Sequence, residues 1–282
     1  MANANVTVTT AANFIPEIWS TEVLEAYVAN LVFGALVDRK FEADVKAKGD
    51  TIHVPNLAAM TVGSKTAGTA VTWSANTETK VDISIDQDYY VAFRIDNIGE
   101  VQSQNNLRQM YTERAGKDLA VQIDDSLAAL VDAFSQTVGT LLVDITDDDL
   151  IRACQYLNDA NAPVADRALV ISPATLASIQ AIDKFVRLDY HNIAGETAVE
   201  QAVMNSPIYG AKVYVSANVD GTNAAGHDNG MFQKEALALV MQQEPKVFSQ
   251  FMIEYIADAV VVEAIWGVKE MRDTSGVWLK GK

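Results

Sequence analysis

Apolar and polar side chains alternate over residues 81–95. The odd positions of this segment are apolar or aromatic except for Gln87, and the even positions are mostly charged, small or polar. A period of two is typical of a β-strand with one buried face. At ~3.3 Å per residue this strand would be about 50 Å long, against a usual length of roughly 5–6 residues. We therefore predict a strand that projects from the body, with a bulge or bend at Gln87.

A helical period follows over residues 104–136. Apolar residues recur four positions apart, with one step of three at the end: Leu107, Tyr111, Ala115, Leu119, Ile123, Leu127, Val131 and Phe134. This spacing predicts a helix about 50 Å long, at ~1.5 Å per residue, with one apolar face. Gly116 lies within it, and glycine is a weak helix former, so we expect a bend or a close helix crossing there.

Residues 16–36 show a second, shorter helical pattern. Trp19, Val23, Tyr27 and Leu31 are four positions apart, which predicts a helix that Gly34 ends or loosens. Residues 1–13 are small and polar. We expect them to form an arm that lies on another molecule or is flexible in isolation.

A basic cluster and a glycine-rich stretch lie between this helix and the alternating segment. The cluster consists of Arg39, Lys40, Lys46 and Lys48. Residues 51–54 alternate as a short strand, and residues 63–68 are rich in Gly, Ser and Thr. That last composition is typical of a mobile loop tip.

Residues 140–230 have the pattern of a compact α/β unit. Its expected elements are a helix with a capping box at Thr146 and Asp149, a buried strand at 167–171, a helix capped by Ser172, a strand at 210–215 and a glycine-rich loop at 220–230. Three further strands are predicted at 236–241, 247–255 and 259–268.

Composition narrows the possible functions. The 282 residues carry 21 basic and 37 acidic side chains, a net charge of −16, which argues against a protein that binds nucleic acid through its phosphates. The single cysteine excludes an intramolecular disulfide framework and a cysteine zinc site. The apolar run at 26–37 is too short to cross a bilayer, so we expect no membrane partner.

No catalytic pattern stands out. The sequence lacks the G-x-S-x-G, G-x-x-x-x-G-K-[ST] and G-x-G-x-x-G motifs, and His53, His191 and His227 have no metal-binding spacing. The acidic run at 147–149 fits the first turn of a helix, where the dipole favours carboxylates. We therefore predict no enzyme activity, no cofactor and no metal.

The predicted parts expose more surface than a monomer keeps in solution. They include an arm, a projecting hairpin and a long helix beside one compact unit. An open sheet edge is a liability unless another chain covers it. We therefore expect a protein whose burial is completed in an assembly of copies.

In their order, these segments resemble the major capsid proteins of tailed bacteriophages, with the α+β Hong Kong 97-like fold. The resemblance is carried by FIPEIWSTEVLEAYVANLVFGALVDRKFE, GDTIHVPN, RALVISPATLASI, IYGAKVYVSANV and FMIEYIADAVVVEAIWGVKEMRDTSGVWL, and it covers essentially the whole chain. It implies an N-arm and N-terminal helix at 1–38, an extended E-loop hairpin at 39–92, a peripheral domain with a long spine helix at 93–139, an axial domain at 140–238 and returning peripheral-domain strands at 239–282.

The resemblance also implies a function and partners. Proteins of this family form hexamers and pentamers that tile an icosahedral shell around double-stranded DNA, without sequence-specific binding. It implies a virion subunit, assembled in the host cytoplasm, with a portal, a scaffolding protein and, in some members, a decoration protein as partners. Because the arm follows Met1 directly, we expect a separate scaffolding protein and no maturation cleavage. A covalent cross-link, found in some members, would fall on Lys65, although most lysines at loop tips are only solvated.

The candidate assembly contacts are Phe14, Trp19, Arg39, Lys40, Lys46, Lys48, Lys65, Trp73, Asp82, Asp86 and Asp88. The basic cluster could pair with Asp82, Asp86 and Asp88 of a neighbouring subunit, or could be ordinary solvated charge. Two other functions remain open: the shell of an encapsulin-type cellular compartment, and a soluble acidic enzyme that uses His191 or His227.

Overall fold

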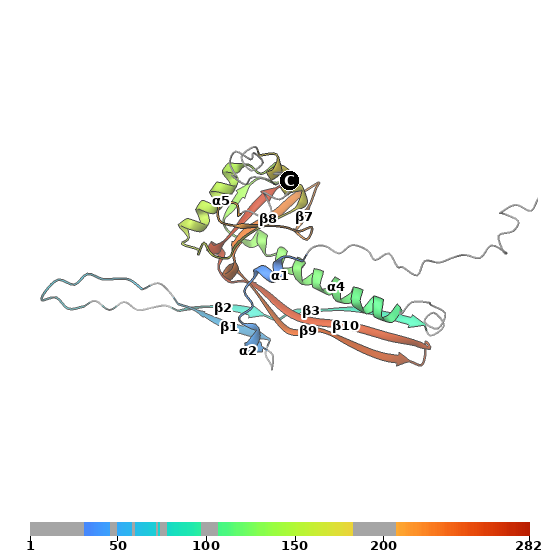
Figure 1. Ribbon diagram of the computed structural model, residues 1–282. Coiled ribbons are helices and arrows are strands. Elements are labelled where there is room, and N and C mark those ends of the chain that lie inside the picture. The colour runs from blue at the N-terminus through green and yellow to red at the C-terminus, as the bar shows by residue number, and fades with distance from the viewer. Residues whose placement is uncertain are drawn as a thin grey trace, which may run out of the picture.

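The structure is a computed structural model that describes residues 31–45, 50–57, 60–71, 73, 78–96, 107–182 and 207–282. These residues form a six-stranded sheet with helices, a three-stranded sheet beside a long helix, and a two-stranded hairpin that projects from the body (Figure 1). This mixture agrees with the α+β class predicted from the sequence. The predicted arm and most of the predicted N-terminal helix, residues 1–30, lie outside the described residues.

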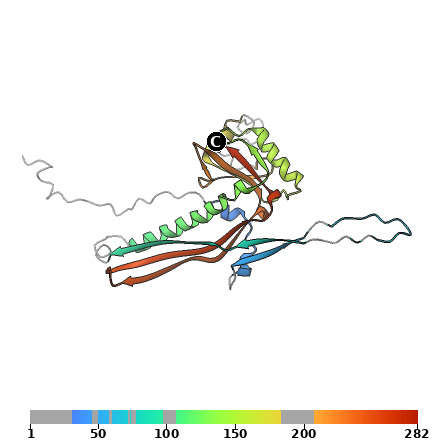
Figure 2. The same cartoon turned by 180° about the vertical axis from the view of Figure 1, so that it is seen from behind.

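The projecting hairpin consists of β1 (Thr51–Asn56) and β2 (Thr79–Ser84). The two strands are antiparallel, with Thr51 opposite Ser84 and Asn56 opposite Thr79. The strand predicted at 51–54 is thereby confirmed. Beyond the paired residues, the described stretch at 60–71 extends far from both larger sheets (Figures 1 and 2).

The alternating segment at 81–95 forms two strands, not the single strand predicted. β2 ends at Ser84, and β3 (Gln87–Asp96) belongs to the three-stranded sheet. Between the strands, the N–H of Ile85 donates to the carbonyl oxygen of Asp50 at 2.8 Å. The apolar face continues through the break, so the alternation predicts which residues are buried but not the change of partner strand. The break between β2 and β3 lies directly before Gln87, the residue at which the sequence predicted a bulge or bend.

The three-stranded sheet has the order β3–β10–β9, and both pairs are antiparallel. Its central strand β10 (Ala257–Glu270) confirms the strand predicted at 259–268. β9 (Leu237–Met252) is one long strand, whereas the sequence predicted two, at 236–241 and 247–255.

Pro245 lies where the two predicted strands were separated. Proline has no N–H to donate to a ladder, and strands pass it at edges or bulges. β9 is an edge strand of this sheet, and its register with β10 shifts between Glu263 and Ile265, opposite the proline stretch. The bulge lets β9 continue past Pro245, although proline usually ends a strand.

The long helix α4 (Leu107–Ala128) packs on the three-stranded sheet (Figure 1). Its apolar stripe is buried as predicted at Ala115, Leu119, Ile123 and Leu127, but Tyr111, which belongs to the same predicted stripe, is 53% exposed. A Cβ atom at Gly116 would meet nothing within 4 Å, so the close helix crossing predicted there is wrong.

The predicted helix continued to residue 136, but α4 ends at Ala128 and a one-turn 3-10 helix, η2 (Val131–Ala133), follows. Val131 and Phe134 are still buried, because they pack against the six-stranded sheet beside Gly230 and Gly276. The apolar period thus continues past the helix because a second sheet buries the next turn. The predicted start at residue 104 lies outside the described residues.

The six-stranded sheet has the order β4–β11–β8–β5–β6, with β7 paired to β8. Its strands are β4 (Thr137–Gly139), β5 (Arg167–Ile171), β6 (Lys212–Val215), β7 (Gly221–Thr222), β8 (Gly226–Gln233) and β11 (Gly276–Gly281). The strands predicted at 167–171 and 210–215 are confirmed. The loop predicted at 220–230 is wrong, because it forms β7 and the first half of β8. β11 lies within 239–282, the range expected to supply peripheral-domain strands, yet it belongs to the six-stranded sheet. The boundaries between the domains stay a prediction.

The glycines that made β8 resemble a loop are required by close packing. A Cβ atom at Gly230 would lie 3.0 Å from the side chain of Val131, and one at Gly226 would lie 2.8 Å from the carbonyl oxygen of Gly281. Gly226 also has a φ of 94°, a backbone conformation that favours glycine. The glycine-rich composition of β8, which is typical of a turn, is therefore explained by the tight packing of this central strand.

The predicted helix starts of the α/β unit are confirmed. Thr146 caps α5 (Asp147–Asp159) in a reciprocal capping box with Asp149. Ser172 caps α6 (Pro173–Gln180), with the proline in the first turn. Two four-residue helices, α1 (Phe33–Leu36) and α2 (Glu42–Val45), precede β1.

The six-stranded sheet separates two cores. Along β5, Ala168 and Val170 face the core that α4 and the three-stranded sheet share, whereas Leu169 and Ile171 face the core under α5 and α6. Because both faces of β5 are buried, its sequence is apolar throughout rather than alternating.

The chain crosses between the two parts at three places in the described residues, and each crossing contains a one-turn 3-10 helix. These are η2, η3 (Lys234–Ala236) and η4 (Asp273–Ser275). The crossings are bonded to one another: the N–H of Ser135 donates to Asp273 Oδ1 at 2.7 Å, and the N–H of Met271 donates to the carbonyl oxygen of Ala236 at 2.8 Å.

Candidate assembly surfaces

The segment that connects β1 to β2 exposes large apolar side chains. The exposed ones are Leu57, Met60, Val62, Val71 and Trp73. Trp73, which the sequence singled out, is 91% exposed, and Lys65 is exposed within the same segment. We refer to the described residues 57, 60–71 and 73 as the loop surface. Water-exposed tryptophan in an extended segment is typical of a contact that is completed by another molecule.

A second apolar surface lies at the end of the β9–β10 hairpin. Its exposed members are Val247, Phe248, Phe251, Met252, Ile253, Tyr255 and Ile256, and Ile253 is 82% exposed. They border an open depression of about 660 Å³ whose lining includes Phe251, Glu254 and Val261. The guanidinium of Arg94 lies 4.2 Å from the ring centre of Tyr255 and places one positive charge at its border. We call residues 247–256 the tip surface. These residues were not among the contacts expected from the sequence.

The loop surface and the tip surface lie at opposite ends of the molecule (Figures 1 and 2). The three-stranded sheet and α4 lie between them. A chain with this shape cannot bring its own loop surface onto its own tip surface. Two copies can, in a head-to-tail arrangement.

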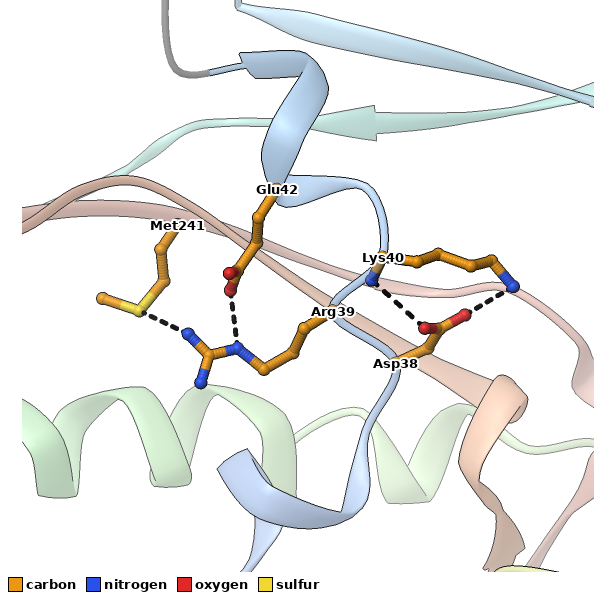
Figure 3. Close-up of polar contacts among 5 residues, drawn as sticks. All are labelled: Asp38, Arg39, Lys40, Glu42 and Met241. Atoms are coloured by element: carbon orange, nitrogen blue, oxygen red, sulfur yellow. Dashed lines mark hydrogen bonds and ion pairs between the residues drawn. The ribbon is translucent and has the colours of Figure 1, made fainter.

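Arg39 and Lys40 of the predicted basic cluster both have partners within their own chain (Figure 3). Arg39 Nε lies 2.6 Å from Glu42 Oε1, and an Arg39 Nη atom lies 3.5 Å from the sulfur of Met241. Lys40 Nζ lies 2.6 Å from Asp38 Oδ2. Both cations remain about half exposed, so they are accessible to a neighbouring chain as well. Lys46, Lys48, Phe14 and Trp19 lie outside the described residues.

Asp82, one of the acidic partners predicted for that cluster, is paired within its own hairpin. Its carboxylate lies 2.6 Å from His53 Nδ1 and 3.0 Å from Lys80 Nζ. Hydrogen bonds from His53 and then from Lys80 lower the pKa of Asp82 below its ordinary value. Asp86 accepts a hydrogen bond from Gln87 Nε2 at 3.0 Å, and Asp88 is exposed on β3. The structure therefore does not bring these aspartates to Arg39 and Lys40 of the same chain, and pairing between subunits stays a prediction.

A larger, polar depression of about 800 Å³ lies where the start of β3, the end of α4 and residues 217–221 meet. Three carboxylates line it, from Asp86, Asp125 and Asp220. Burial raises the pKa of Asp125, and the neighbouring charges of Asp124 and Asp220 raise it further. Of these carboxylates the sequence singled out only Asp86, as a possible contact, and no pattern indicated the depression itself, because its residues come from three distant segments.

His227 and Cys154 each have a hydrogen-bond partner within the chain. His227 Nε2 lies 2.9 Å from Asn223 Oδ1 in the β7–β8 turn, and the Cys154 thiol donates to the carbonyl oxygen of Tyr209 at 3.4 Å. Within the described residues, no group of three or more His, Cys, Asp or Glu side chains is placed to hold a metal ion. No helix among them is long and apolar enough to span a membrane. His191 lies outside the described residues.

Comparison with known proteins gives matches among solved structures only. No family model and no curated protein matches the chain. A chain from a structure of Mycobacterium phage Che8 is 28% identical, with a TM-score of 0.83 over 95% of this chain and 97% of that chain. A chain from the capsid structure of the cyanophage P-SCSP1u is 16% identical, with a TM-score of 0.80 over 99% and 96%. A chain from the mature capsid of bacteriophage PhiM1 is 14% identical, with a TM-score of 0.74 over 94% and 91%.

These matches extend over nearly the full length of both partners, so they include the projecting hairpin and both sheets together. The chain therefore has the fold of bacteriophage capsid structures, and its resemblance to bacteriophage major capsid proteins is confirmed.

Proposed function

We propose that this chain is the shell subunit of an icosahedral bacteriophage capsid and assembles into hexamers and pentamers. Its role is structural rather than enzymatic. The observation that carries the proposal is the pair of exposed apolar surfaces at opposite ends of one chain. The fold shared with capsid structures supports it.

The arrangement of the two surfaces favours rings and shells over pairs. When one surface of a subunit binds a different surface of the next, the contact leaves a free surface at each end of the growing assembly. Such head-to-tail contacts close into rings when the rotation between subunits divides a full turn evenly. In this proposal the loop surface of one subunit covers the tip surface of its neighbour.

The remaining parts take the roles that the resemblance implies. The projecting hairpin is the E-loop, α4 is the spine helix, and residues 1–38 are the N-arm. The axial domain, which the resemblance places at 140–238, corresponds to most of the six-stranded sheet and its helices; β4 and β11 of that sheet come from outside that range. The partners are further copies of the chain, a portal, a scaffolding protein and, in some virions, a decoration protein, around double-stranded DNA. The net charge of −16 fits an inner surface that releases DNA rather than gripping it.

The loop-to-tip contact is tested with two single variants, Trp73→Ser and Phe251→Ser. Each removes one surface and keeps the other. Alone, each variant should stay monomeric in sedimentation velocity, while the wild-type chain forms shells in negative-stain micrographs. Mixed together, the two variants should form one-to-one pairs and nothing larger, because only one intact loop and one intact tip can meet. Ile151→Ser, at an exposed apolar position on α5, is the matched control and should assemble like the wild type.

Other outcomes identify other arrangements. If Phe251→Ser alone formed dimers, the loops would be binding each other and the head-to-tail contact would be wrong. A wild-type chain that stayed monomeric would contradict the shell function itself. Shells isolated from infected cells and treated with nuclease would contain protein cargo and no DNA if the chain formed an encapsulin-type compartment.

A further inference from the structure

Asp124 is a buried carboxylate that binds the backbone of a distant segment. It lies on α4 and is 2% exposed. Its Oδ1 accepts a hydrogen bond from the N–H of Gly34 at 3.0 Å, and its Oδ2 accepts one from the N–H of Val32 at 3.2 Å. The side-chain amide of Asn218 donates to Oδ2 at 3.4 Å. No ion pair found in the described parts of the chain includes Asp124.

A buried carboxylate is costly unless donors surround it. Here the donors are two backbone N–H groups and one amide, and hydrogen bonds to a charged acceptor are about twice as strong as neutral ones. The two oxygens bind alternate residues of the same short stretch, so they fix both its position and its direction. The carboxylate thus contributes an anchor rather than a charge pair.

The anchored stretch is also held from the other part of the molecule. Phe33, between the two anchored amides, is fully buried, and its ring stacks on Phe232 of β8 with a centroid distance of 6.1 Å. Farther along, the N–H of Asp38 donates to the carbonyl oxygen of Leu237 at 3.0 Å. Residues 32–38 therefore touch α4, the six-stranded sheet and β9 in succession.

We propose that Asp124 is a positioning residue for assembly: it fixes the point and direction at which the chain N-terminal to Val32 joins the body. The assembly part of this inference rests on the proposed shell function, in which residues 1–38 are an arm that binds neighbouring subunits. An arm whose root can swing reaches different neighbours in different copies. A fixed root gives every subunit the same reach, which a regular shell requires.

The anchor is tested with Asp124→Asn in the full-length, unassembled protein. The amide side chain keeps the shape but turns one acceptor oxygen into a donor, which then faces a backbone N–H. We expect hydrogen exchange in a peptide covering residues 31–37 to become at least tenfold faster, as loss of a hydrogen bond to a charged group implies. Exchange in β5 should stay unchanged.

Asp125→Asn is the matched control, because it removes the neighbouring carboxylate on the same helix and leaves the anchor in place. It should leave exchange at 31–37 at the wild-type level. In assembly, Asp124→Asn should give irregular or open particles in negative stain, and Asp125→Asn should give normal shells. Wild-type exchange in Asp124→Asn would overturn the inference.

The two proposals can fail separately. If the wild-type chain forms no shells, the exchange measurement still decides whether Asp124 anchors residues 32–34. If Asp124→Asn exchanges faster and its shells are regular, the anchor is present but has no part in assembly. If Asp124→Asn does not fold, Asp124→Glu takes its place: a folded Glu variant with protected amides supports the anchor. Failure of both variants to fold would show a requirement of the whole fold and overturn the positioning role.

Discussion

The ring of Phe134 lies so close to Gly276 that a Cβ atom added to the glycine would sit 2.2 Å from two ring carbons. Both residues are buried, and Gly276 has an extended backbone with a φ of −129°, so the constraint is steric rather than conformational. We expect Gly276→Ala to lower the free energy of unfolding by about 1–3 kcal/mol, as overpacking does in well-packed cores. Urea denaturation monitored by circular dichroism measures this loss.

Gly116→Ala is the control for that substitution. Nothing lies within 4 Å of a Cβ atom at Gly116, and the residue is inside a regular helix. Because alanine is the better helix former, we expect a gain of about 0.5–1 kcal/mol. A loss at both positions would show that the packing seen at Phe134 is not the cause.

Asp125→Asn should raise stability at neutral pH. The pKa of Asp125 is raised above 3.8 in the folded chain, first by burial and then by the charges of Asp124 and Asp220. A raised folded pKa means that the folded state holds the proton more tightly than the unfolded state, so the wild type loses stability as pH rises through this range. The advantage of the variant should therefore be small near pH 3 and grow above about pH 4. Thermal unfolding at several pH values tests it, and an advantage that shrinks with rising pH would contradict it.

Thr146→Ala should destabilise the chain by about 1 kcal/mol. Thr146 Oγ1 accepts the N–H of Asp149, and Asp149 accepts the N–H of Thr146 at 3.0 Å, so the variant loses half of a reciprocal cap. Thr112→Ala, inside α4, is the comparison, because its hydroxyl donates back to the carbonyl oxygen of Arg108 and caps no helix start. Equal effects in chemical denaturation would argue against the capping contribution.

The double variant Arg39→Ala/Lys40→Ala separates internal pairing from contacts between subunits. Arg39 and Lys40 are themselves about half exposed, although Asp38 is buried, and ion pairs with an exposed member contribute about 0.2–1 kcal/mol each, so the isolated subunit should remain folded. If the cluster also pairs with a neighbour's aspartates, shell yield in light scattering should fall well beyond that small loss and depend on salt. An unchanged yield would leave these residues as solvated charge.

Much of the fold could be predicted from the sequence because helices and strands with one buried face have apolar residues at regular intervals. The apolar stripe of α4, the uniformly apolar β5 and the capping residues Thr146 and Ser172 are all local signals. The errors share one cause. Periodicity shows which side of an element is buried but not what buries it, so the break at Ile85 and the end of α4 at Ala128 were not visible.

The candidate surfaces were less predictable, for a related reason. Trp73 was among the candidate contacts, but the residues of the tip surface were not, because they have the pattern of an ordinary apolar strand end. The contacts of Asp124 join residues up to 94 positions apart, and no local pattern records such a pairing. The loop predicted at 220–230 was wrong because glycine is required both in turns and where two segments pack closely, and the sequence alone does not distinguish the two causes.

The three 3-10 crossings have a mechanical consequence. If one strand alone joined the part that contains the six-stranded sheet to the part that contains the three-stranded sheet, the two parts could rotate relative to each other. Because three short connections that are hydrogen-bonded to one another join them, we expect the two parts to move as one rigid body. If copies of this chain must meet at different angles in rings of five and of six, the difference cannot be absorbed inside the body. In the proposed shell, that difference would be taken up by bending at the two thin extremities, the projecting hairpin and the end of the β9–β10 hairpin.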